Sequence, residues 1–180
     1  MTESELEKLR YPIGKFSFIN SYTPADVKKW IRDIEKCPAV LKKALKGLNE
    51  KKLNTPYRDG GWTVKQVVHH LADSHMNAYI RIKLALTANT PTINPYNESM
   101  WAEYDDAKKL SPSVSLSLIE ALHHRWSIAN KKIKPEELSK AVFHPEKKRE
   151  VSIVEFLALY SWHCRHHCAH ITSLRKRNKW

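Results

Sequence analysis

The 180-residue sequence predicts an all-α fold in which four long helices form one bundle. Apolar residues recur at helical spacing over four long segments, and we find no alternation of apolar and polar residues typical of half-buried strands. Only four glycines occur, and prolines separate the segments, so we expect helices joined by long, irregular connections. The length suits one domain, and the sequence shows no repeat or linker that would divide residues 1–180.

The first long helix is expected to begin after Thr23, which can cap it, with Pro24 at the first helical position. Pro38 should kink or split this helix, because proline lacks the N–H that a helix interior requires. The apolar stripe then resumes over residues 40–48. A loop rich in turn residues is predicted for residues 54–61.

The second long helix should begin at Thr63, because Thr63 and Gln66 have the spacing of a capping box. Its apolar stripe extends to about Thr87. Two prolines then predict an irregular connection, with a short helical turn near residues 101–107.

A third long helix is expected after residues 111–112 and should end at Pro135. The stretch from there to Pro145 is predicted to be irregular or short-helical. The fourth helix should begin at Ser152, which forms a second capping-box spacing with Glu155, and continue almost to the C-terminus.

Composition and charge narrow the function class. Hydrophobic residues make up 42% and charged residues 28%, as in ordinary soluble proteins. No apolar run is long enough to span a membrane and no signal peptide is visible, so we expect a cytoplasmic protein.

The formal net charge of +12 could favour binding to nucleic acid. However, the lysines and arginines are spread along the chain without a known nucleic-acid motif. Solvated helix faces explain this charge better than a nucleic-acid partner.

The three cysteines, Cys37, Cys164 and Cys168, cannot all pair with one another. The spacing of the last two does not match a redox motif or a zinc ribbon. We therefore predict free thiols buried in the core, with a role as soft metal ligands as the alternative.

Four histidines within residues 163–170 form the most informative motif. Because residues four apart share one helix face, His163 can bind an ion together with His167, and His166 can do so with His170. At about 100° per residue, His163 and His167 fall inside the apolar stripe of the last helix. His170 lies near the edge of that stripe, and His166 is expected to face solvent.

A second histidine pair lies on the second helix, where His70 borders the buried side and His69 points further from it. Three imidazoles with one position left open are the usual ligand set of catalytic zinc. We therefore predict that His70, His163 and His167 bind one metal ion. The other histidines are predicted to be exposed or hydrogen-bonded locally: His75, His123, His124 and His144.

Two segments resemble the DinB/YfiT-like superfamily, most closely the YfiT type of metal-dependent hydrolase. They are residues 57–64, Tyr-Arg-Asp-Gly-Gly-Trp-Thr-Val, and residues 67–75, Val-Val-His-His-Leu-Ala-Asp-Ser-His. The opening at residues 11–15 and the C-terminal segment 160–171 are similar as well, so the resemblance covers nearly the full chain.

This resemblance implies a DinB-like four-helix bundle and a cytoplasmic protein that is often a homodimer. It also implies zinc or nickel bound by His70, His163 and His167, the same residues that helix register selects. The sequence departs from the commoner relatives at His170, where many have glutamine, and in the two nearby cysteines.

A divalent ion at this site would lower the pKa of bound water, which predicts hydrolysis of a small-molecule substrate. Asp73, one turn beyond His70, is a candidate acid or base, although a solvated carboxylate or a partner of the metal ligands is an equal alternative. The Arg58–Asp59 loop could line the mouth of the pocket or form an ordinary turn.

Two other functions stay open at this stage. The resemblance extends to transferases that use the metal to bind a low-molecular-weight thiol such as bacillithiol, whose thiolate would take the open position. A non-catalytic metal or nucleic-acid binding protein is the second alternative, although structural zinc sites are usually closed by four protein ligands. Three histidines also suit copper or iron.

Overall fold

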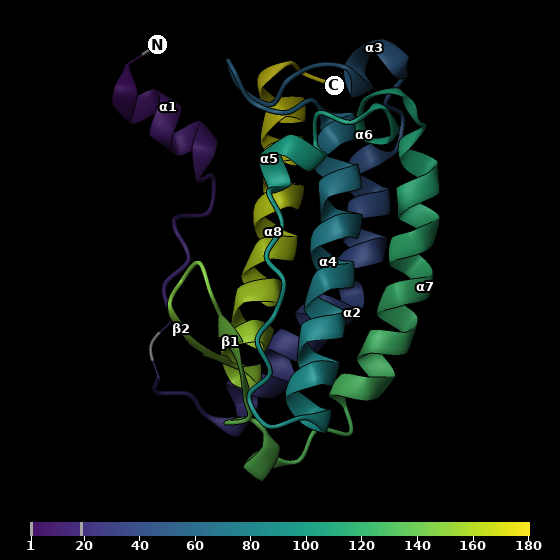
Figure 1. Ribbon diagram of the computed structural model, residues 1–180. Helices are drawn as coiled ribbons and strands as arrows, with labels where there is room; N and C mark the ends of the chain where they lie inside the picture. The colour runs from purple at the N-terminus through teal and green to yellow at the C-terminus, as the bar shows by residue number, and fades with distance from the viewer. Residues whose placement is uncertain (1, 19) are drawn as a thin grey trace.

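The computed structural model describes residues 2–18 and 20–180. Its main body is a bundle of four long helices that run alongside one another (Figure 1): α2 (Pro24–Leu45), α4 (Val64–Thr87), α7 (Pro112–Asn130) and α8 (Ile153–Arg177). Helices α2 and α4 lie diagonally across the bundle, and each packs against both α7 and α8. The predicted four-helix bundle is confirmed.

Shorter elements connect these helices: α1 (Glu3–Arg10), α3 (Glu50–Leu53), α5 (Glu98–Trp101), α6 (Asp105–Lys109) and a 3-10 turn, η1 (Pro135–Glu137). An antiparallel hairpin, β1 (Ala141–His144) and β2 (Arg149–Ser152), lies beside the first turns of α8 (Figure 1). The sequence did not predict this hairpin, because strands of four residues are too short to show a clear alternation. Helix α1 stands apart from the four long helices (Figure 1).

The starts of the long helices follow from their capping residues. At α4, the hydroxyl of Thr63 accepts the N–H of Gln66 at 3.2 Å, and the Gln66 amide oxygen accepts the N–H of Thr63 at 2.9 Å. At α8 only half of the predicted box forms. The Ser152 hydroxyl accepts the N–H of Glu155, but the Glu155 carboxylate instead binds the guanidinium of Arg149 at 2.8 and 2.6 Å.

Helix α2 begins at Pro24 as predicted, but it is not split at Pro38. Because proline has no N–H, the carbonyl oxygen of Ile34 one turn earlier has no helical donor. The Nδ1 of His123, on the facing helix α7, donates a hydrogen bond to that oxygen at 2.7 Å. A side chain thus replaces the bond that the helix loses at Pro38.

The core consists of two clusters of buried apolar side chains, one at each end of the bundle. Trp126 and Leu157 belong to one cluster, and Leu71 and Ile171 belong to the other. Each long helix contributes to both clusters and carries polar or sulfur-containing residues between them: Cys37, His75, His123, His163, Cys164 and His167. The sequence therefore places a polar layer in the middle of the bundle.

Candidate metal centre

His70 of α4 and the pair His163 and His167 of α8 converge in this layer. One ligand nitrogen from each lies within 4.8 Å of the other two. The Nε2 atoms of His70 and His163 are 3.3 Å apart, and two nitrogens on one tetrahedral zinc ion are about 3.4 Å apart. The donor set and its spacing therefore fit a divalent metal ion.

The surroundings keep these three imidazoles neutral. Burial lowers the pKa of His70 to about 4. Burial and the neighbouring histidines hold the pKa values of His163 and His167 well below the usual range. A neutral imidazole retains the lone pair that a metal ion requires.

A chain of hydrogen-bonded imidazoles extends from His163 into the core. The Nδ1 of His163 lies 3.1 Å from the Nε2 of His75. The Nδ1 of His75 lies 2.7 Å from the Nε2 of His123, whose own Nδ1 donates to the carbonyl oxygen of Ile34. His75 and His123 are completely buried, with exposed fractions of 0% and 1%.

This chain determines which nitrogen of each ring carries the proton. A carbonyl oxygen can only accept, so neutral His123 is protonated on Nδ1 and accepts at Nε2. His75 must then donate from Nδ1 and accept at Nε2, and His163 must donate from Nδ1. The lone pair of His163 is therefore on Nε2, the atom that faces His70, as a metal ligand in this position requires.

His75 and His123 are hydrogen-bonded, but to partners on other helices rather than locally as predicted, and His124 is exposed. Their connection to a predicted metal ligand was missed, because it depends on contacts among three helices. The signal in the sequence was Pro38, whose missing N–H leaves a carbonyl oxygen that a buried donor can use.

His166 is buried, so the prediction that it faces solvent is wrong. The indole of Trp162 stacks on its ring at 4.2 Å between centroids, and the ring of Tyr11 lies 6.0 Å away. The helical periodicity of α8 could not reveal that the segment after α1 covers this face.

The remaining neighbours have hydrogen-bond partners outside the three-histidine group. His69 contacts the hydroxyl of Ser115 at 2.7 Å and the carbonyl of Leu110 at 3.2 Å. His170 donates from Nε2 to the carbonyl of Arg10 at 3.0 Å.

Two further groups of potential ligands occur among the described residues. One comprises His166, His167 and His170, and shares His167 with the first group. The other comprises Cys37, His75 and His123, in which hydrogen bonds already use both nitrogens of each histidine.

The three predicted ligands open on a cavity of about 380 Å³. The indole of Trp62 forms part of its wall and lies 4.6 Å from the ring of His70. Arg81, Tyr96 and Lys147 also line this cavity. The site is therefore accessible to a small molecule.

Asp73 does not line this cavity. It lies in a separate hollow with Asp106, and burial together with the charge of Asp106 raises the pKa of Asp73 to about 6. Arg58 donates to the carbonyl of Asp59 at 2.8 Å, within its own loop. The structure thus brings together the predicted metal ligands but places neither Asp73 nor this loop at the cavity.

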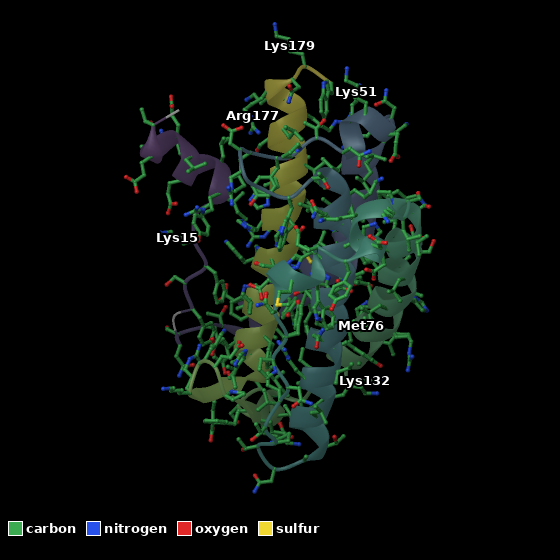
Figure 2. All side chains as sticks on the ribbon, turned by 45° about the horizontal axis from the view of Figure 1, so that its top comes forward. Lys15, Lys51, Met76, Lys132, Arg177 and Lys179 are labelled. Carbon is green, nitrogen blue, oxygen red and sulfur yellow. The ribbon has the colours of Figure 1, made fainter. Side chains whose placement is uncertain are left out.

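The other sequence predictions concern thiols, membranes and charge. Cys37, Cys164 and Cys168 are free and buried, as expected. Among the described helices, none combines the length and apolar character needed to cross a bilayer. The labelled Lys15 and Lys132 lie at separate parts of the periphery, whereas Lys51, Arg177 and Lys179 lie at the same end of the bundle (Figure 2).

The chain is similar to known proteins over nearly its full length. Proteins from Bacillus mycoides (strain KBAB4) and Bacillus cereus (strain 03BB102) are 50% and 52% identical over 175 residues, covering 97% of this chain and 100% of each relative. Both carry the name "Putative metal-dependent hydrolase". The solved structure of YfiT from Bacillus subtilis is also similar, with a TM-score of 0.93 and 47% sequence identity. The match covers 96% of this chain and 99% of YfiT. That protein is described as a probable metal-dependent hydrolase with an unusual four-helix bundle topology. Residues 33–171 match the DinB superfamily, and the chain therefore belongs to it.

Proposed function

We propose that this protein is a metal-dependent hydrolase whose divalent ion is held by His70, His163 and His167. The observation that carries the proposal is the 3.3 Å separation of the His70 and His163 Nε2 atoms beside His167, at the wall of a small-molecule cavity. When bound there, a divalent ion supplies Lewis acidity toward water and substrate. The names of the relatives support the same class of reaction.

The residues of the chain would orient the ligands and shape the cavity. The His75–His123 chain fixes the tautomer of His163, and Trp62 packs against the ring of His70. Burial raises the pKa of the Tyr160 phenol, which donates to the carbonyl oxygen of Ser74 at 3.1 Å. Tyr160 therefore serves as a neutral wall residue rather than as a base.

The carboxylates that line this cavity are Glu98 and Glu146, whereas Asp73 lies elsewhere. We propose that one of these two glutamates, rather than Asp73, exchanges protons with the substrate. Zinc is the first candidate for the ion and nickel the second, because imidazole nitrogens suit both.

Elemental analysis of purified variants tests the ligand set. His70→Ala, His163→Ala and His167→Ala should each lose most of the bound metal. His69→Ala is a matched control, because His69 is equally buried on α4 but contacts Ser115 and Leu110 instead. His166→Ala is a second control, and both controls should retain the metal. Equal retention in all five variants would contradict the assignment.

A metal-dependent thiol transferase is the second candidate, favoured by the cationic residues Arg81 and Lys147 in the cavity wall. These charges suit an acidic low-molecular-weight thiol such as bacillithiol. Supplying that thiol with an electrophile distinguishes the two activities. Conjugation that requires the thiol indicates a transferase, and cleavage without it indicates a hydrolase.

The proposal includes a homodimer that acts in the cytoplasm. Apolar side chains exposed on α4 and α7 support self-association: Ile80 is 51%, Val114 54% and Ile128 55% exposed. Three free, buried thiols are compatible with a reducing compartment. Light scattering of the purified protein measures the oligomeric state, and a monomer at micromolar concentration would contradict the dimer.

A further inference from the structure

We infer that the metal cavity contains an anion-binding subsite centred on Arg81, so that the substrate carries a carboxylate or phosphate group several bonds from the bond that reacts. This inference rests on the proposed function, because it assigns a substrate class to the same cavity. Its basis is a buried guanidinium that lines the cavity and has no carboxylate partner.

Arg81 and His70 lie on the same face of α4. Their separation corresponds to about three helical turns, roughly 16 Å along the axis, with only about 20° of rotation between them. Side chains on a helix lean toward its N-terminus, which directs the Arg81 side chain back toward His70. A small molecule could therefore contact the guanidinium at one end and the metal centre at the other.

The charge of Arg81 is poorly compensated within the protein. The residue is only 9% exposed, yet its one hydrogen bond within the described part of the chain is from Nη2 to the carbonyl of Asn94 at 3.3 Å. The ring of Tyr96 lies 5.9 Å from its Cζ. Within the same described part, no carboxylate forms an ion pair with Arg81.

A guanidinium has five N–H donors, and burial without a counter-charge is unfavourable. The planar arrangement of these donors matches carboxylate and phosphate oxygens. Arg149 shows the contrast, because its guanidinium already binds the Glu155 carboxylate through two hydrogen bonds. Arg81 is therefore available for an anion from outside the protein.

Lys147, in the turn of the β1–β2 hairpin, adds a second positive charge at this end of the cavity. His144 lines the same cavity, but its lowered pKa keeps the imidazole neutral, so it adds no charge. The pKa values of both residues are lowered mainly by burial, and the charge of Arg81 contributes to both shifts. Glu98 and Glu146 line the same cavity and are exposed, as Lys147 is, so solvent screens all three charges and the buried charge of Arg81 is screened least.

Metal-chelating probes test the subsite in the zinc-loaded protein. The probes are monohydroxamates of straight-chain dicarboxylic acids, from succinic to suberic acid, each paired with an analogue that ends in a primary alcohol. The hydroxamate binds zinc, and the tether carries the second group toward Arg81. Titration calorimetry should show that the acid binds about tenfold more tightly than the alcohol at the best tether length, as expected for a charge-assisted contact.

Arg81→Gln should abolish this preference while binding the alcohol probe as the wild type does. Arg125→Gln is the matched control, because Arg125 lies over a tyrosine ring, that of Tyr79, at a similar 5.7 Å but does not line the cavity. It should retain the preference. Phosphonate-ended probes distinguish a phosphate subsite from a carboxylate subsite, because the better anion shows the larger preference.

Three results would overturn the inference. Equal affinity of acid and alcohol probes for the wild type would exclude the subsite but leave the metal centre intact, since the hydroxamates still bind. Equal weakening of both probes in Arg81→Gln would show that Arg81 only supports the structure. If Arg81→Gln does not fold, Arg81→Lys is tested in its place. Loss of the preference for the acid probe in Arg81→Lys would be the third result that overturns the inference. Failure of every hydroxamate to bind, or of zinc to load, would instead contradict the proposed function itself.

Discussion

The Nδ1 atom of His123 lies 2.7 Å from the carbonyl oxygen of Ile34. This oxygen has no backbone donor, because the residue one turn later in α2 is Pro38. The hydrogen bond fixes the proton of His123 and, through His75, that of His163. A proline on one helix thus determines the tautomer of a proposed metal ligand on another.

Replacing His75 with alanine should weaken zinc binding by about 10- to 100-fold, the usual effect of removing a partner of a metal-bound histidine. The Nδ1–H of His163 would lose its acceptor, so the ring could rotate or change tautomer. Competition with a zinc chelator measures the affinity. Nitrogen NMR of the metal-free protein reports the tautomer of His163 independently.

His69→Ala is the control for this experiment. His69 is also a buried, hydrogen-bonded histidine of α4, so its loss imposes a similar cost on folding. Its partners lie outside the chain that reaches His163, and zinc affinity should be nearly unchanged. Equal losses of affinity in the two variants would show that the imidazole chain has no specific role.

Pro38→Ala should weaken metal binding without lowering stability. An alanine N–H would restore the helical hydrogen bond to Ile34 and remove a residue that is unfavourable by about 3 kcal/mol in a helix interior. The same N–H would share the oxygen that now accepts from His123. We expect resistance to urea to stay equal or rise while zinc affinity falls a few-fold. Higher zinc affinity in this variant would contradict the proposed role of the free carbonyl.

The long helices were predictable because their signals are local. Thr63 and Gln66 define the start of α4, and the apolar stripe of α8 identifies His163 and His167 as inward-facing. Helix register selected the three histidines that converge, since a helix places residues on its faces with a fixed period. The family resemblance selected the same residues.

The remaining features depend on contacts that helical period does not encode. His166 is buried because Tyr11, far away in sequence, packs near its ring. The Glu155 carboxylate leaves its capping role because the hairpin brings Arg149 within 2.6 Å. Asp73 is one turn from His70 in sequence, yet it faces the hollow that contains Asp106.

Gly61→Ala should destabilise the fold by about 1–3 kcal/mol, the range for overpacking a tight site. A Cβ at Gly61 would lie 2.7 Å from the Arg58 Cγ and 3.2 Å from both the Arg58 carbonyl oxygen and the ring of Tyr57. Relief of these contacts would move the adjacent Trp62, which packs on His70. Urea denaturation measures the change, and Gly47→Ala is an informative comparison.

At Gly47 an added Cβ meets nothing within 4 Å, but the backbone has a φ of +78°, which is unfavourable for alanine. Both variants should therefore lose stability, for different physical reasons. Only Gly61→Ala should also alter tryptophan fluorescence or weaken zinc binding. Unchanged zinc affinity in Gly61→Ala would show that this loop does not help to position His70.

Asp73→Asn should stabilise the protein at pH 7.5 and have little effect near pH 4. Burial and Asp106 raise the pKa of Asp73 to about 6 in the folded protein, from an ordinary value of 3.8. Between these pH values the folded state binds the proton more tightly than the unfolded state, so this residue lowers stability as the pH rises through about 6. Because Asp73 is partly exposed, solvent screening reduces the full effect of the shift to about 1 kcal/mol.

Urea denaturation of wild type and Asp73→Asn across this pH range measures the difference, and the comparison cancels the titration of the histidines. Asp106→Asn should give a smaller gain at pH 7.5, since the charge of Asp106 is the lesser cause of the shift. The gains of the two variants should not add, because each relieves the same repulsion. A gain that is equal at both pH values would mean that packing, rather than the charge of Asp73, sets its contribution to stability.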